Sequence, residues 1–390
     1  MLQFVGLLRQ NVRNYAMFIA LAVIVAFFSI ATGGLFISPY NLTNLINQTG
    51  AVGILAAGMT LIIIIRHIDL SVGYLCGFYG AVAAVFLTQQ HLLTVLAIVI
   101  VLVLGGLFGL LFGVLAGKVG VPSFVATLAG MIGGEGLLLL ATSAHGTISI
   151  TDGILVGVGN GFVPSWFRLG RLNGTTVVIG LLGMVAFVVT QVRGWRKRKA
   201  SGADAGPVSF LIAKIALAVL VTGFFAYEFG IENGISWTFV ILAIVVSALT
   251  VVLNRTRFGR YVYGVGGNPE AAELSGVSVA RVTITVFVIM GVLTGLAGLL
   301  YAGRMQSASP TGGTGFELLA IAAAFIGGCS ASGGVGKVTG SVVGALIMQS
   351  LVNGMMLMEI DVSIQYIVQG VILVAAVVFD VVSRRSRAVA

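Results

Sequence analysis

Charged side chains are scarce in this chain. Only 8% of its 390 residues are Asp, Glu, Lys or Arg, whereas soluble proteins carry about 25%. Hydrophobic residues make up 58% of the chain, and 55 glycines accompany them, which suits closely packed membrane helices. This composition excludes a soluble globular domain. It predicts an all-α polytopic membrane protein with about 10–12 transmembrane helices, some of them broken or re-entrant.

Cysteine and histidine are also rare, which limits the chemistry available to the chain. The two cysteines, Cys76 and Cys329, lie in or beside apolar runs and form neither a disulfide framework nor a thiolate metal site. Three scattered histidines, His67, His91 and His145, offer no zinc spacing and suggest no catalytic triad. The nucleotide-binding pattern G-x-x-x-x-G-K-[S/T] is missing too. An intramembrane enzyme is therefore disfavoured, and we expect no metal.

Twelve apolar runs account for most of the chain. One of them, Phe316–Ile326, is too short to cross a bilayer, and we expect half a helix there. Two apolar runs joined by a polar, glycine-containing elbow occur at Gly50–Leu87 and again at Phe316–Leu351. An internal duplication and a chance similarity explain this repeat equally well. The predicted regions are five spans within 15–141, an outer loop at 142–173, a hairpin at 174–235 with a basic cytoplasmic loop at 193–207, a polar cytoplasmic loop at 254–281, and four spans within 282–382.

The distribution of Lys and Arg sets the orientation. With the N-terminus inside, 17 of the 21 basic residues fall on the inner side and only Arg168, Arg171 and Arg304 on the outer side. Cytoplasmic loops of membrane proteins are enriched in these residues, so both termini are predicted to be cytoplasmic. The same rule explains the net charge of +9 without a nucleic-acid partner.

The loop at 254–281 is the longest segment after Pro207 that a bilayer would not accept. Within it Asn268 can cap a helix that starts at Pro269, with Glu270 in the first turn where the helix dipole favours negative charge. Gly276 stands where such a helix would end. We predict a short surface helix, Pro269–Ser275, behind a glycine-rich turn, Gly264–Gly267.

A few polar residues within or beside the apolar runs are candidates for a translocation path or gate. Glu135 has two interpretations, a functional group inside its span or a wetted carboxylate near the outer end. Asp69, beside Ser71 in the elbow that follows Arg66, either forms an ion pair that fixes the elbow or takes part in gating. Glu317 lies at the start of the short run.

Two further candidates, Gln349 and Asn353, are four residues apart and share a helix face. They are equally consistent with a polar path for a hydroxyl-rich solute and with a hydrogen bond that ties two helices together.

The segment R-F-G-R-Y-V-Y-G-V-G-G-N-P-E-A-A-E-L-S-G-V-S-V closely resembles the cytoplasmic coupling loop of bacterial ABC-importer permeases for ribose, xylose, arabinose and galactose. Further matches are G-M-T-L-I-I-I-I-R-H-I-D-L-S-V-G, V-P-S-F-V-A-T-L-A-G-M, S-P-T-G-G-T-G-F-E-L-L-A-I-A-A, G-S-V-V-G-A-L-I-M-Q-S-L-V-N-G-M and Q-Y-I-V-Q-G-V-I-L-V-A-A-V-V-F-D. The resemblance covers nearly the whole chain in order. The extra hairpin and Q-Y-I-V-Q-G are most similar to the xylose-type members.

The resemblance implies a permease subunit of an ATP-driven importer for a sugar, a pentose such as xylose, in the bacterial inner membrane. The implied partners are a second copy of the chain, a cytoplasmic ATP-binding subunit that uses ATP and Mg, and a periplasmic or lipid-anchored sugar-binding protein. The chain would bind no cofactor itself. The residues implied to dock on the ATPase are Arg260, Gly264, Gly267, Asn268, Pro269, Glu270, Ala271, Ala272 and Gly276.

The chain departs from the family pattern at several positions. Arg66 and His67 replace a pair of small residues, Glu135 replaces an Arg, Leu319 replaces an Asp, and G-G-C-S-A-S-G-G replaces G-G-T-S-L-A-G-G. The alternative class is a secondary carrier coupled to ions or protons, which would need no ATPase.

Overall fold

The computed structural model describes residues 2–143, 146–202 and 206–388, with side chains from 17 to 378. His145 and part of the predicted basic loop, residues 203–205, lie outside the described residues. The chain divides into two units, one made of residues 1–36, 45–161 and 238–390 and the other of residues 37–44 and 162–237. Each unit is described by itself.

Helices account for most of the described chain, as predicted. In order, the helices are α1 Leu2–Ala31, α2 Pro39–Ile64, α3 Val72–Thr88, α4 Thr94–Val114, α5 Ser123–Thr142, α6 Gly153–Asn160, α7 Gly174–Ala200, α8 Val208–Ile231, α9 Trp237–Arg255, α10 Arg257–Gly267, α11 Pro269–Leu274, α12 Val279–Met305, α13 Phe316–Ile326, α14 Val338–Leu357 and α15 Val362–Ala388. A 3₁₀ turn, η1 Leu35–Ile37, follows α1, and a π-helical turn, η2 Leu115–Val119, extends α4.

Within the described residues there are four two-residue strands: β1 Ile148–Ser149, β2 Arg168–Leu169, β3 Leu172–Asn173 and β4 Ser307–Ala308. They form two antiparallel pairs, β1 with β4 and β2 with β3.

The helices match the twelve predicted apolar runs. Eight of the described helices are long and apolar enough to cross a membrane, and four shorter apolar stretches occur at Met17–Ala31, Val72–Thr88, Phe316–Ile326 and Val362–Val378. α13 has the predicted bounds, and its 11 residues span only about 16 Å of a hydrocarbon core of about 30 Å. The class of all-α polytopic membrane protein is confirmed.

Glycines bring α4 and α12 of the first unit into backbone contact. A Cβ added at Gly105 would lie 2.3 Å from the Gly291 oxygen, and one at Gly109 would lie 2.3 Å from the Phe287 oxygen. Four residues separate Gly105 from Gly109, so both lie on one face of α4, the small-residue spacing that lets membrane helices approach closely. No larger residue fits this crossing without moving the helices apart.

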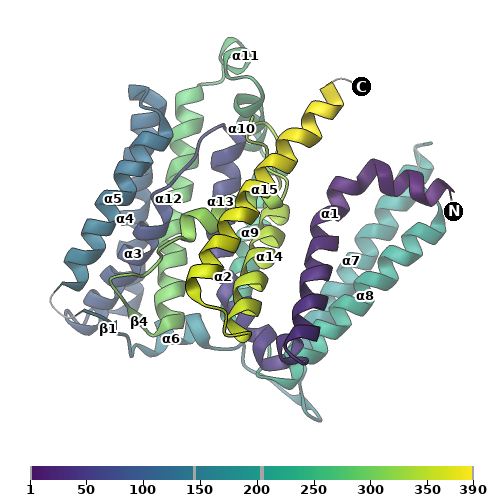
Figure 1. Cartoon of the computed structure of the whole chain (residues 1–390), viewed down its shortest axis with the longest axis horizontal. Helices are drawn as coiled ribbons and strands as arrows, with labels where there is room; N and C mark the ends of the chain where they lie inside the picture. The colour runs from purple at the N-terminus through teal and green to yellow at the C-terminus, as the bar shows by residue number, and fades with distance from the viewer. Residues whose placement is uncertain (1, 144–145, 203–205, 389–390) are drawn as a thin grey trace. The chain divides into compact units, whose positions relative to one another are not determined.

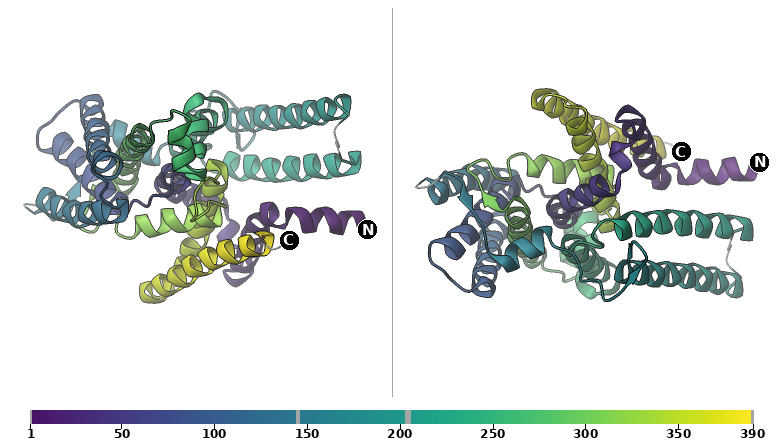
Figure 2. Two further views of the ribbon diagram at one scale, coloured as in Figure 1. Left: turned by 90° about the horizontal axis from the view of Figure 1, so that it is seen from above. Right: turned by 90° about the horizontal axis from the view of Figure 1, so that it is seen from below.

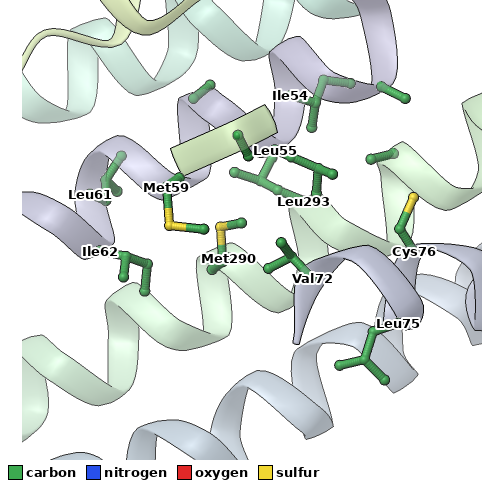
Figure 3. Close-up of a cluster of buried hydrophobic side chains, with 14 of the residues drawn as sticks. Ile54, Leu55, Met59, Leu61, Ile62, Val72, Leu75, Cys76, Met290 and Leu293 are labelled. Carbon is green, nitrogen blue, oxygen red and sulfur yellow. The ribbon is translucent and has the colours of Figure 1, made fainter. Parts of the chain in front are cut away.

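The core of the first unit lies between α2, α3 and α12. Figure 3 shows Met59 of α2 facing Met290 of α12, with Leu293 and Val72 beside them. Such apolar packing holds α2, α3 and α12 in a single arrangement relative to one another. Cys76 in this core and Cys329 after α13 are both without exposed surface, and neither forms a disulfide.

Different connecting segments lie at the two ends of the first unit. At one end α11 lies beyond α10, and α6 with β1 lies at the opposite end (Figure 1). At the α6 end the amide of Asn160 donates to the Arg304 oxygen at 2.7 Å, at the end of α12. These segments are the ones predicted to lie on the inner and outer sides, so the arrangement within this unit agrees with the charge distribution.

In the second unit α7 and α8 form an antiparallel hairpin, and they lie side by side in both views of Figure 2. Lys214 donates to Gln191 at 2.9 Å across it. The basic run Arg193–Lys199 was predicted to belong to a loop, but α7 continues to Ala200, so this run forms the last turns of a helix. Cations there complement the negative end of the helix dipole.

Candidate coupling surface and translocation cavity

The short helix α11 forms where its capping residues predict. The Asn268 carboxamide oxygen accepts from the Ala271 amide at 3.0 Å, and Pro269 occupies the first helical position. Gly276 has φ 82° and ends the helix in a conformation that other residues adopt at a cost. The predicted surface helix is therefore confirmed, one residue shorter than expected.

The predicted glycine-rich turn Gly264–Gly267 is wrong, because these residues are the last turn of helix α10. α10 is amphipathic, with Val262 and Val265 buried and Arg260 exposed. Gly266 lies on the buried face, which approaches another backbone segment closely. A Cβ at Gly266 would lie 1.9 Å from the Ile64 oxygen. Tertiary packing thus overrides the low helix propensity of glycine.

Helices α10 and α11 enclose an open groove of about 300 Å³. Leu274, at the end of α11, has 90% of its surface exposed. We call this region the coupling surface. Its groove is lined by Arg260, Tyr261, Gly264, Asn268, Ala271, Ala272, Ser275 and Val277. Of the other residues predicted to dock on an ATPase, Gly267, Glu270 and Gly276 are exposed beside it and Pro269 is half-buried.

The elbow after α2 does not contain the ion pair that was one interpretation of Asp69. Asp69 is buried, and its Oδ1 accepts from the Ser71 amide at 2.9 Å and from the Ser71 hydroxyl at 2.6 Å. Arg66 has φ 65°, a left-handed conformation that costs a non-glycine residue about 1–2 kcal/mol. Its guanidinium donates instead to the Gly266 oxygen at 2.7 Å and to the Gly267 oxygen.

A second cavity, also of about 300 Å³, lies among α2, α12, α13 and α14 on the side predicted to be outer. We call it the outer cavity. Its polar groups include the amides of Asn47, Gln48 and Gln349 and the guanidinium of Arg304, and the rings of Tyr301 and Phe316 meet edge to face beside them, with centroids 5.0 Å apart. Asn47 is 6% exposed, and its Oδ1 has no hydrogen-bond partner among the described residues. The cavity therefore offers unused amide hydrogen-bonding capacity beside aromatic surface.

Of the predicted path residues, Gln349 lines the outer cavity and Asn353 hydrogen-bonds to Gln48 at 3.4 Å. Sequence reasoning missed Asn47, Gln48 and Arg304. The first two lie on a membrane helix, because α2 begins at Pro39, eleven positions before the apolar run at Gly50. Their position directly before an apolar run was the available signal.

The two carboxylates of the apolar runs have different surroundings. Glu317 is buried in the first turn of α13, where its Oε2 lies against Gly73 of α3 and has no hydrogen-bond partner among the described residues. Glu135 is half-exposed on α5 and is not among the residues that line the outer cavity. Within the described residues no group of His, Cys, Asp and Glu is arranged to hold a metal ion.

Comparison with known proteins assigns the family. The model of the family described as "Branched-chain amino acid transport system / permease component" matches residues 41–377. The chain belongs to this family of transport permeases. The permease is 38% identical to the xylose transport system permease protein XylH of Escherichia coli K12 over 382 residues, 98% of this chain and 95% of that protein.

Two further relatives extend the comparison. The permease is 38% identical to XylH of Haemophilus influenzae over 376 residues, 96% of this chain and 98% of the relative. It is 33% identical to the ribose import permease protein RbsC of E. coli K12 over 365 residues, 93% and 92% of the two chains. No solved structure matches.

Family membership confirms three predictions. The chain is a transport permease and not an enzyme. It is one component of a transport system whose other steps are carried by other chains. With its apolar helices and its bacterial relatives, it is a multi-pass protein of the bacterial inner membrane.

Proposed function

We propose that the permease forms the translocation path of an ATP-driven importer for a sugar, a pentose such as xylose. Its relatives of nearly equal length are named as permeases for xylose and ribose. In this proposal two copies of the chain assemble with a cytoplasmic ATP-binding subunit, which uses ATP and Mg, and a periplasmic or lipid-anchored sugar-binding protein. The permease itself holds no cofactor.

The observation that carries the proposal is the coupling surface. Polar helix ends and an exposed Leu274 are presented on the predicted cytoplasmic side of a chain that is otherwise apolar. A soluble subunit can insert a side chain into the groove between α10 and α11, because residues of both helices form its walls. Exposed apolar groups rimmed by polar ones typically mark protein-binding surfaces. The ATPase would hold α11 there and move it.

The outer cavity is the proposed entry to the path. A pentose carries hydroxyl groups that exchange hydrogen bonds with amides and carbon faces that pack on aromatic rings, and the cavity offers both through Gln349 and Tyr301. Most of its lining residues are apolar, so it would hold sugar weakly and release it, as conduction requires. In this proposal Asn353 orients Gln48, Asp69 and Ser71 shape the gate at the elbow, and Glu317 and Glu135 lie beside the path.

One observation favours a second candidate, a carrier coupled to protons. The buried Glu317 has a carboxylate oxygen without a partner among the described residues, and carboxylates inside membrane helices often relay protons. Such a carrier would work without an ATPase.

Reconstitution in liposomes separates the two candidates. The permease is assembled alone, with its ATPase, and with the ATPase and the binding protein, and uptake of radiolabelled xylose, ribose and arabinose is measured with and without ATP inside. We expect uptake only in the complete assembly with ATP. Equal uptake by the permease alone, driven by a pH gradient and abolished by Glu317→Gln, would establish the carrier instead.

The coupling surface is tested with Glu270→Ala and Gly276→Ala. Both should reduce co-purification of the ATPase while the permease stays folded, because α11 loses an exposed charge or its helix stop. Glu232→Ala, in the loop between α8 and α9, removes a charge from a segment that the charge distribution predicts to be outer; it is the matched control and should retain the ATPase. Normal co-purification of both α11 variants would refute the assignment of this surface.

A further inference from the structure

Three segments far apart in the sequence meet at the predicted cytoplasmic end of α2. They are the end of α2 at Ile64–Arg66, the end of α10 at Gly266–Gly267, and the loop residues Gly333–Gly334 between α13 and α14. We call this meeting point the inner junction. It lies directly behind the coupling surface, because Asn268, which caps α11, follows Gly267 in the chain.

The end of α2 has the hydrogen bonds of a helix stop with a left-handed residue. The Arg66 amide donates to the Ile63 oxygen at 3.0 Å and the His67 amide to the Ile62 oxygen at 3.0 Å. This pattern usually has glycine at the left-handed position, whereas here it is Arg66, with φ 65°. The conformation turns the arginine side chain away from the elbow.

The arginine side chain reaches the end of α10. Its Nε donates to the Gly266 oxygen at 2.7 Å and a terminal nitrogen to the Gly267 oxygen. The last carbonyls of a helix lack partners within the helix and carry its negative dipole end, so a cation with two donors matches them in charge and geometry. Arg66 thus holds two successive carbonyls of α10 from the end of α2.

Backbone contacts make the junction tight. The Gly334 amide donates to the Ile64 oxygen at 2.8 Å, and a Cβ at Gly333 would lie 2.3 Å from the Arg66 Cγ. The Tyr263 hydroxyl of α10 donates to the Gly336 oxygen at 2.8 Å. Burial raises the pKa of this phenol, so it remains a donor at neutral pH.

We propose that Arg66 is a positioning residue that transmits movement of α10 and α11 to the end of α2 and hence to the elbow that carries Asp69. This inference rests on the proposed function, because it assumes that an ATPase moves the coupling surface. A displacement of α11 is passed to Gly267 through the covalent backbone. From there it passes through two charge-assisted hydrogen bonds into α2, whose other end reaches the outer cavity at Asn47 and Gln48.

The test uses the complete assembly of permease, ATPase and binding protein in liposomes, with Arg66→Ala and Arg66→Lys. Sugar import and ATP hydrolysis are measured together, since their ratio reports coupling. For Arg66→Ala we expect normal ATPase binding and hydrolysis, with imported sugar per ATP lowered at least about tenfold, the change that corresponds to losing even one of the two charge-assisted hydrogen bonds. Arg66→Lys keeps a point charge that reaches one carbonyl, so we expect partial recovery.

Arg281→Ala is the matched control, because it removes an exposed cation from the first turn of α12, on the same predicted cytoplasmic side but outside the inner junction, and should leave the ratio unchanged. An unchanged ratio in both Arg66 variants would overturn the inference. Equal loss of hydrolysis and import, together with lost ATPase binding, would also overturn it, since Arg66 would then serve docking alone. If Arg66→Ala fails to fold, Arg66→Lys decides. Failure of the wild-type assembly to import sugar with ATP would instead refute the proposed function.

Discussion

The crossing of α4 and α12 allows one residue to be compared with its neighbour. Gly105 faces α12, and an added Cβ would lie 2.3 Å from the Gly291 oxygen and 3.0 Å from the Gly291 carbonyl carbon. Gly106 lies at the edge of the crossing, and its added Cβ would meet only a side chain of α12, the Val292 Cγ2 at 3.4 Å, an ordinary contact. Gly105→Ala and Gly106→Ala therefore add the same methyl group to adjacent positions of one helix, and only the first has no space for it.

The magnitude follows from this geometry. Relieving the contact at Gly105 requires the helices to separate by roughly 1 Å. A gap of that size removes about a quarter to a half of the attractive energy of each van der Waals contact between the two helices. Overpacking of this kind costs about 1–3 kcal/mol. Both variants share the helix-propensity gain of about 1 kcal/mol for alanine over glycine, which cancels in their difference. We expect Gly105→Ala to be less stable than Gly106→Ala by about 1–3 kcal/mol.

The assay is thermal unfolding of both variants and the wild type in the same detergent, followed by intrinsic tryptophan fluorescence. We expect the midpoint for Gly105→Ala to lie at least roughly 2 °C below that for Gly106→Ala. Equal midpoints, or a higher midpoint for Gly105→Ala, would show that the α4–α12 approach is not a constraint on stability.

Three other predictions address the loops. Asn268→Ala removes the cap of α11 and should cost about 1 kcal/mol, seen as faster amide exchange at 270–276, with Asn268→Asp restoring protection. Gly313→Ala should destabilise more than Gly315→Ala in thermal unfolding: both have φ near 80°, but only at Gly313 would a Cβ meet backbone, the Gly73 oxygen at 2.2 Å, and equal losses would contradict this. Tyr263→Phe should lose about 1 kcal/mol with its hydrogen bond to Gly336, and an unchanged unfolding midpoint would count against it.

Features set by neighbouring residues could be predicted from the sequence. The cap of α11 depends on Asn268, Pro269 and Gly276, which lie within nine positions, so local chemistry determined it. The bounds of α13 follow from the apolar run between two glycine-rich segments. The apolar runs likewise located the crossing helices, because lipid excludes polar backbone from anything but helix.

Features that depend on distant segments could not be predicted in this way. Arg66 was expected beside Asp69 because opposite charges lay close in sequence, yet its bonded carbonyl at Gly266 is 200 positions away. The glycines at 264–267 indicated a turn, but they are the last turn of α10, and Gly266 packs against the Ile64 oxygen, in the same distant segment as Arg66. The outer cavity joins side chains from four helices, and no local pattern brings Asn47 and Arg304 together.

The burial of both cysteines has a practical consequence. Cys76 and Cys329 have no exposed surface, so alkylating reagents should leave them unmodified in the folded protein. A thiol introduced in place of the exposed Leu274 would then take up a maleimide fluorophore selectively without removal of the native cysteines. Changes in its emission would follow α11 through each turnover of the assembled importer.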